Sequence, residues 1–258
     1  MQPKPEARSS LEYGTKLVEP AMGGWSFVLY PDAAEGGGSF RSAVAPSPSG
    51  QSSDPPIDSR DDAARRARGK VRRYCAANRL NRLGTLTYRG EGRHDPGALR
   101  QDVGGFFRRL RGDVGEPFPY LWVPEWHKSG HGLHVHFAVG RFIGVRRIES
   151  AWGHGFVHIK LLGNLPIGSG PLGEARLAAR YLSKYLAKDL DAGGQPAGSH
   201  RYEVAEGFQP RSLRLDGTSA DQVLGWAETV MGAPSAHVWR SRDELDWVGP
   251  PAVWASWA

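Results

Sequence analysis

The sequence predicts an α+β fold in which helices cover a mainly antiparallel sheet. Between residues 83 and 190, segments rich in β-branched and aromatic residues alternate with segments whose apolar residues recur at helical spacing. Their order is strand, helix, two strands joined by a short Gly-containing turn, strand and helix. Because a short turn joins antiparallel neighbours, this order indicates a sheet that is mainly antiparallel.

Residues 1–60 are predicted to form a largely disordered N-terminal segment. Residues 31–60 contain three consecutive glycines, several prolines and many serines. They hold too few large apolar side chains to offset the entropy lost on folding. The apolar residues 25–30 are the exception, as a short strand or a docking segment.

Residues 61–195 are predicted to form the main domain, which begins with a helix. Asp61 and Asp62 precede a run of Arg and Lys residues, an order that suits the helix dipole. Arg72 and Arg73 of this helix are candidate contacts to DNA backbone phosphates. A solvated helix face is the alternative interpretation.

The remaining elements follow from local pattern. Apolar residues at helical spacing mark one amphipathic helix, with Leu99, Val103, Phe106 and Leu110 on its buried face. Strands are predicted at residues 83–88, 120–126, 133–139 and 155–161, and a second long helix at about 173–190. Residues 196–258 are expected to be a C-terminal extension that packs on this core, with a helix at 221–231 and a Trp-rich tail.

Composition indicates an intracellular protein with a polyanionic partner. The net charge of +6 favours binding to phosphates, which attract Lys and Arg. Cys75 is the single cysteine, which excludes an intramolecular disulfide and a Cys-based zinc site and suits the cytoplasm. We see no secretory signal and no apolar stretch near the ~20 residues needed to span a bilayer, so no membrane partner is expected.

The segment at residues 132–139 predicts a metal site. Alternation along a strand points His134 and His136 to one face, and Leu133, Val135, Phe137 and Val139 into the core. Glu125, on the preceding strand, is close enough across the hairpin to be a third ligand. Two imidazoles and one carboxylate leave coordination positions open for water or a phosphate oxygen. Surface histidines on a half-exposed strand are the alternative.

The helix around residue 181 carries a candidate nucleophile. Tyr181, Lys184, Tyr185 and Lys188 share one face, apart from the apolar stripe formed by the leucines. A lysine beside a tyrosine hydroxyl favours the charged, nucleophilic form of that hydroxyl. An amphipathic helix with half-buried tyrosines and solvated lysines is the alternative interpretation.

Three segments together resemble the HUH endonucleases. Residues 83–88 resemble the first motif of that family, His134-Val135-His136 its second, and Tyr181-Leu182-Ser183-Lys184-Tyr185 its third. The pair of tyrosines with an intervening lysine is similar to microvirus-type and related phage and plasmid replication initiators. The resemblance covers about residues 62–192 and implies a five-stranded antiparallel sheet with flanking helices and a ferredoxin-like core.

The resemblance also implies roles for individual residues. His134, His136 and Glu125 would bind Mg²⁺ or Mn²⁺. Tyr181 would attack the scissile phosphate to leave a 5′-phosphotyrosine, Tyr185 would act in the next round, and Lys184 would hold the phosphate or assist proton transfer. Contacts to DNA are expected from Arg72, Arg73, Thr87, Tyr88 and Lys188.

The implied function is nicking and rejoining of single-stranded origin DNA in rolling-circle replication. No P-loop pattern occurs in the sequence, so a host or plasmid helicase would unwind the duplex in trans. Two alternatives stay open. One is a relaxase or transposase with the same core, and the other is a module that binds single-stranded nucleic acid without cutting it.

Overall fold

The computed structural model describes residues 23–42, 59–161, 170–191 and 202–258, with the backbone alone for residues 59–63 and 185–191. Five helices and two five-stranded sheets make up this described part of the chain, which confirms the predicted α+β class. Within it, no helix combines the length and apolarity that a membrane span requires.

The first sheet has the strand order β6-β3-β5-β4-β7, and its neighbouring strands pair antiparallel. The predicted strands are all present, as β3 (Arg82–Tyr88), β4 (Tyr120–Trp126), β5 (Leu133–Val139) and β6 (Gly155–Leu161). The short β7 (Glu203–Val204) adds the fifth strand. This is the five-stranded antiparallel sheet with flanking helices that the sequence predicts.

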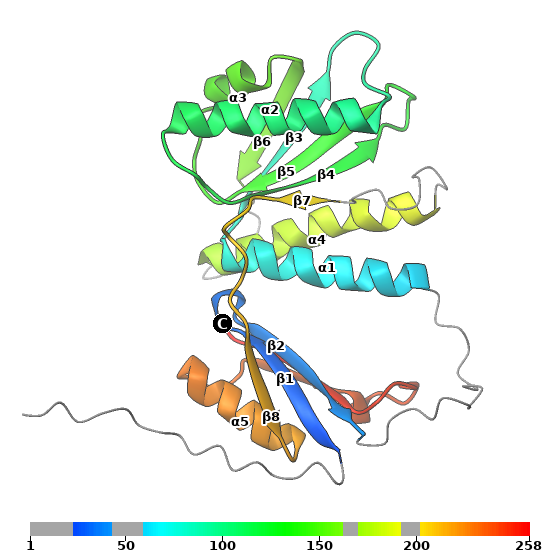
Figure 1. Cartoon of the computed structure of the whole chain (residues 1–258), viewed down its shortest axis with the longest axis vertical. Coiled ribbons are helices and arrows are strands. Elements are labelled where there is room, and N and C mark those ends of the chain that lie inside the picture. Colours follow the sequence, from blue (N-terminus) through cyan, green and yellow to red (C-terminus); the bar gives the residue numbers. More distant parts are fainter. Residues whose placement is uncertain (1–22, 43–58, 162–169, 192–201) are drawn as a thin grey trace, which may run out of the picture.

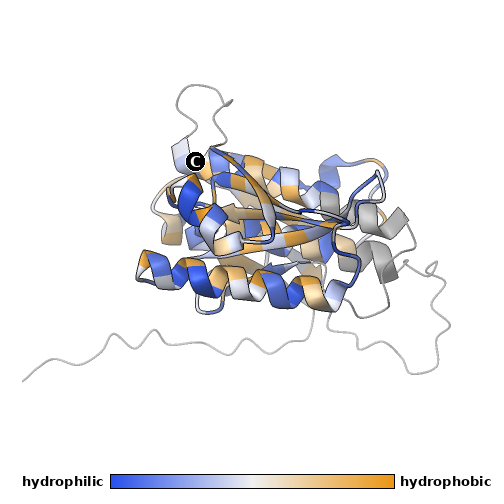
Figure 2. Cartoon of the chain, turned by 90° about the horizontal axis from the view of Figure 1, so that it is seen from above, coloured by the Kyte–Doolittle hydropathy of each residue, from blue (hydrophilic) through white to orange (hydrophobic). Residues whose placement is uncertain are grey.

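Helices cover both faces of the first sheet. On one side lie α2 (Pro96–Val114) and α3 (Val145–Trp152), and on the other α1 (Ser59–Ala77) and α4 (Gly170–Asp191). Figure 1 shows the layers from top to bottom: α2 and α3, the first sheet, α4 and α1, a second sheet, and a last helix. Seen from above, hydrophilic and hydrophobic residues alternate along the helices, as amphipathic packing requires (Figure 2).

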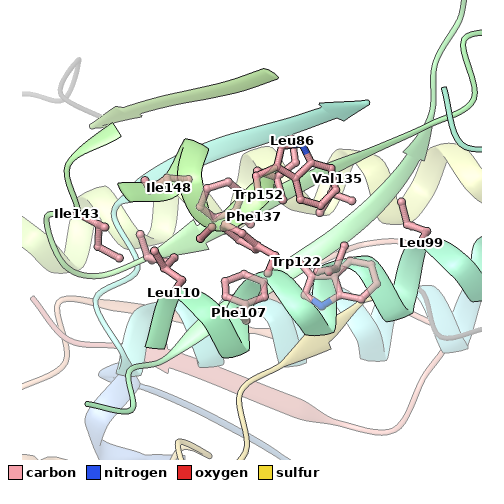
Figure 3. Close-up of a cluster of buried hydrophobic side chains, with 14 of the residues drawn as sticks. Leu86, Leu99, Phe107, Leu110, Trp122, Val135, Phe137, Ile143, Ile148 and Trp152 are labelled. Atoms are coloured by element: carbon pink, nitrogen blue, oxygen red, sulfur yellow. The ribbon is translucent and has the colours of Figure 1, made fainter. Parts of the chain in front are cut away.

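The larger core lies between the first sheet and α2 with α3. Leu133, Val135, Phe137 and Val139 of β5 all point into it, as the alternation predicts. Phe106 and Phe107 of α2 meet Phe137 edge-on, and Trp152 of α3 is fully buried beside them (Figure 3). Burial of several large aromatic side chains at one place accounts for much of the stability of this layer.

The opposite face of the first sheet changes character along its strands. Near one end its residues are apolar, and Leu83, Leu121 and Ala138 pack with Leu182 of α4 and Val71 of α1. Toward the other end the same face becomes polar. An apolar end fixes α4 on the sheet, while the polar end is left for a functional site.

A second sheet contradicts the expected disorder of residues 1–60 and the expected simple extension at the C-terminus. Its strand order is β8-β1-β2-β10-β9, built from both ends of the chain. The strands are β1 (Gly24–Tyr30), β2 (Glu35–Arg41), β8 (Leu213–Gly217), β9 (His237–Arg240) and β10 (Ala252–Ser256), and α5 (Ala220–Met231) covers one face. The predicted strand at 25–30 and helix at 221–231 are both present in it.

The glycines of β2 have a packing role rather than a role in disorder. A Cβ on Gly36 would lie 2.4 Å from the Phe27 ring, and one on Gly38 2.3 Å from the Ser26 carbonyl oxygen. Only glycine lets β1 and its buried Phe27 approach this closely. The composition of residues 36–38 therefore misleads, because small residues here serve close strand contact.

An ion pair joins the helix layer to the second sheet. Arg72 Nε and Nη2 donate to the two carboxylate oxygens of Glu35 at 2.8 and 3.1 Å, and Arg73 lies 3.9 Å away. The Glu35 side chain is only 2% exposed, whereas that of Arg72 is 42% exposed. These two arginines therefore anchor the second sheet as well as lining its surface.

Replacing Arg72 with Ala is expected to destabilise the protein. The substitution leaves the buried Glu35 carboxylate with Arg73 as its remaining partner, at a cost of about 1–3 kcal/mol after allowance for the exposure of Arg72. The free energy of unfolding in urea measures this cost. Arg214→Ala is the matched control, because its pair with Asp216 is exposed and should contribute under about 1 kcal/mol. Equal losses in the two variants would contradict the anchoring role.

Candidate active site

The polar end of the first sheet is built by three neighbouring strands. In the antiparallel register, Thr85 of β3 and Val123 of β4 both lie opposite His136 of β5. Glu125 lies opposite His134 in the same way. The Thr85, Glu125 and histidine side chains point toward α4, so the hairpin brings Glu125 to the two histidines as the sequence predicts.

His136 sits at the centre of this group. Its Nε2 lies 2.7 Å from Glu125 Oε2, which accepts a hydrogen bond, and its Nδ1 lies 3.2 Å from the Thr85 hydroxyl. The residue is 7% exposed. Contacts at both ring nitrogens fix the orientation of the imidazole.

His134 has one nitrogen held and one open. Its Nδ1 lies 3.4 Å from the Thr87 hydroxyl, while its Nε2 is buried and has no hydrogen-bond partner among the described residues. Burial, followed by the charges of His127, His136 and His131, lowers the pKa of His134 to about 4. Its imidazole is therefore neutral at neutral pH, which is the form that binds metals.

The donor atoms fit a divalent cation, although they are not yet gathered around one point. Two imidazole nitrogens and a carboxylate are a common set for such ions, and the unpartnered His134 Nε2 is suited to a ligand. In the described part of the chain, however, no three His, Cys, Asp or Glu side chains already form a metal-binding group. Glu125 and His136 bond to each other, and a metal ion would replace that bond.

Tyr181 reaches the same place from the helix layer. Its ring centroid lies 6.4 Å from that of His136, at an interplanar angle of 80°. The side chain is half-buried against the apolar end of the face, next to the fully buried Leu182. Lys184, one turn later, is exposed. The structure thus brings Tyr181, His136 and Glu125 together, with Lys184 on the solvent side of α4.

Two of the predicted residues cannot be placed in the same way. Tyr185 and Lys188 belong to the last turns of α4, where side chains lie outside the described residues. Their roles remain predictions.

The predicted DNA contacts on β3 are separated by the pleat. Thr87 faces the site and touches His134, so it orients a histidine. Tyr88 points to the opposite face, is 4% exposed, and donates from its hydroxyl to Asp102 at 2.9 Å. Tyr88 packs edge-on against Trp152 and is therefore a core residue, contrary to the expectation of a DNA contact.

Sequence reasoning missed Thr85 and undervalued His127. Thr85 could have been found from alternation, since it shares the face of Thr87 two residues on. His127 follows β4, and its ring stacks on His134 with centroids 4.4 Å apart. Its position depends on the path of the hairpin turn, which the sequence alone does not specify.

Comparison with known proteins places this geometry in context. Residues 81–190 match the family model of the replication-associated protein ORF2. The matched region runs from β3 to α4 and holds every residue of the candidate site, whereas the second sheet lies outside it. This match supports a relationship to rolling-circle replication initiators. No curated protein and no solved structure matches the chain.

Replacing Thr85 with Val is expected to weaken divalent-metal binding about 10- to 100-fold, because the His136 imidazole loses the hydroxyl that orients it. Titration with Mn²⁺ by calorimetry measures the change. Thr229→Val, on the exposed side of α5, is the matched control and should bind as the wild type does. Unchanged affinity in Thr85→Val would show that this threonine does not position the ring.

Proposed function

We propose that the protein is a replication initiator that nicks and rejoins single-stranded DNA at an origin, through a tyrosine and with the help of a divalent metal ion. One observation carries the proposal. Tyr181 of the helix layer meets His136 and Glu125 of the sheet, at the polar end of an otherwise apolar face. The match of residues 81–190 to a replication-associated family supports the same conclusion.

Tyr181 is the proposed nucleophile. Its phenolic oxygen forms a bond to the scissile phosphorus, the bond from phosphorus to the 3′-oxygen breaks, and that oxygen takes up a proton. The products are a 5′-phosphotyrosine and a free 3′-hydroxyl. Lys184, exposed one turn away on α4, would hold the phosphate. Tyr185 would attack in the following round.

His134, His136 and Glu125 would hold Mg²⁺ or Mn²⁺. When bound, such an ion polarises the scissile phosphate and offsets charge on its oxygens. The open Nε2 of His134 and the threonine contacts at both Nδ1 atoms support this assignment, since they direct the remaining nitrogens to a ligand.

The edge strand β6 offers a surface for the incoming DNA. Phe156, His158 and Lys160 lie on the face of the sheet that carries the site, because β6 pairs Phe156 with Thr87 and His158 with Thr85. Phe156 is 71% exposed, which is unusual for a large aromatic residue unless it contacts a partner. An exposed ring beside basic side chains suits stacking of a DNA base.

Phe156→Ala is expected to raise the dissociation constant for single-stranded DNA about 5- to 100-fold, through loss of one stacked base. Fluorescence anisotropy with a labelled oligonucleotide measures this. Phe142→Ala is the matched control, because Phe142 is 78% exposed but follows β5 outside that face. Similar affinity in the two variants would contradict a stacking role for Phe156.

The direct test is incubation of the protein with labelled single strands that span its replicon's origin, with Mn²⁺ or with EDTA. We expect metal-dependent cleavage and a DNA-linked protein band on a denaturing gel. Cleavage that is insensitive to EDTA would overturn the metal part of the proposal.

A binding module that does not cut DNA is the second candidate. It is favoured by the finding that the described residues form no ready metal-binding group. Tight binding of a strand that contains the nick site, without cleavage or adduct in Mn²⁺, would establish this candidate instead.

A further inference from the structure

A groove lies between the helix layer and the second sheet, away from the candidate active site. Its volume is about 730 Å³. One wall carries arginines of α1 and α4, namely Arg65, Arg66, Arg68, Arg176 and Arg180. The other wall is the second sheet, which contributes Trp254 and Ser256 of β10. Tyr181 is on the opposite side of α4, toward the first sheet.

The groove has a strong excess of positive charge. Among its described lining residues, seven are arginines and Glu35 alone is acidic. Arg72 already pairs with Glu35, and Arg176 donates to the carbonyl oxygens of Ala34 and Trp257. Arg68 and Arg180 are exposed and form no ion pair with another described residue. Like charges gathered in a concave surface attract a polyanion and are poorly explained by folding.

The sheet wall adds aromatic surface. Trp254 lies opposite Trp239 in the register of β10 and β9, so both rings lie on the face that is turned to α1 and α4. Gly37 lies opposite Trp254 on β2 and has no side chain to cover the ring. Arg72 lies over the Trp254 ring, 5.5 Å from its centroid, and joins the two walls.

We propose that this groove binds single-stranded DNA, with the arginines on its phosphates and Trp254 against a base. Arginines that follow the backbone beside aromatic rings on a sheet are the pattern of single-strand sites. A duplex is instead bound by elements that project into its grooves, whereas this surface is concave. The choice of DNA as the ligand rests on the proposed function, while the charge and shape of the groove do not.

The position of the groove explains what it adds to the chemistry. Arg180 and Ser183 line it, and they flank Tyr181 and Leu182 on the same helix. A strand held in the groove therefore passes within a helix width of the proposed nucleophile. Because the second sheet lies outside the matched residues 81–190, this site is an addition to the family core.

The test compares Arg68→Gln/Arg180→Gln with wild type in binding oligo-dT, which contains no nick site. Anisotropy titrations at several salt concentrations give the affinity and its salt dependence. We expect the affinity to fall on the order of 10-fold and the salt slope to decrease by about 1.4, or about 0.7 for each phosphate that is no longer bound. Trp254→Leu is a second variant, and thermal melts confirm folding of both.

Arg108→Gln/Arg146→Gln is the matched control, since it removes two exposed arginines from α2 and α3 on the far side of the first sheet. Equal affinity and salt slope in the groove and control variants would overturn the inference. So would a groove variant that loses affinity for duplex DNA but keeps it for oligo-dT. Loss of oligo-dT binding together with an absence of nicking in the wild type would uphold the groove and reject the proposed function.

Discussion

Tyr181→Phe is expected to abolish the covalent DNA adduct and to lower the rate of first-strand cleavage on the order of 10⁴-fold or more. The substitution removes the phenolic oxygen of the ring that lies beside His136, while the ring that packs against the helix layer is kept. Loss of a covalent nucleophile has effects of this size in other enzymes. Quenched single-turnover cleavage of an origin oligonucleotide measures the rate.

Two further variants make this result specific. Tyr30→Phe removes a hydroxyl on the second sheet, beside Arg73, and should cleave as the wild type does. Tyr185→Phe should keep the first cleavage but lose rejoining in the next round. A Tyr181→Phe protein that still forms the adduct at the wild-type rate would assign the nucleophile elsewhere.

His136→Ala is expected to lower metal-dependent cleavage on the order of 10²- to 10³-fold, the size of losing one electrostatic contact to the transition state. The variant removes a donor nitrogen and also the partner of Glu125. Cleavage rates across a Mn²⁺ titration measure the effect, with binding of Mn²⁺ followed separately by calorimetry. Oligonucleotide affinity should change little in the absence of metal.

His237→Ala is the control for this prediction, because His237 is an exposed histidine of β9 in the second sheet. It should leave both the Mn²⁺ affinity and the cleavage rate unchanged. If His136→Ala kept the wild-type response to Mn²⁺, the metal would have to bind elsewhere.

Local pattern was sufficient to predict the first sheet and the direction of its side chains. The alternation at residues 133–139 separates the histidines from the core residues, and β5 shows that separation in full. The hairpin turn fixes the register between β4 and β5, so Glu125 could be placed opposite His134. Short-range rules succeed here because both strands are close in sequence.

The second sheet could not be predicted because its strands come from opposite ends of the chain. β2 pairs with β1 along one edge and with β10, more than 200 residues later, along the other. Its glycines look like a linker, although Gly36 and Gly38 are required by contacts with β1. Arg72 was assigned to DNA for a similar reason, since its buried partner Glu35 lies 37 residues away.

The position of Tyr88 could have been predicted with more attention to the pleat. Thr87 and Tyr88 are neighbours in a strand, so their side chains must point to opposite faces. One of them faces the histidines and the other enters the core with Trp152. Assigning both to DNA was inconsistent with the strand that the same residues predict.

The most direct test of the central claim is mass spectrometry of the protein after reaction with an origin oligonucleotide in Mn²⁺, followed by nuclease and protease digestion. We expect a 5′-linked nucleotide on the peptide that contains Tyr181, and none when EDTA is present. A cleaved oligonucleotide with no modified peptide, or a nucleotide attached outside α4, would contradict the assignment of Tyr181 as the nucleophile.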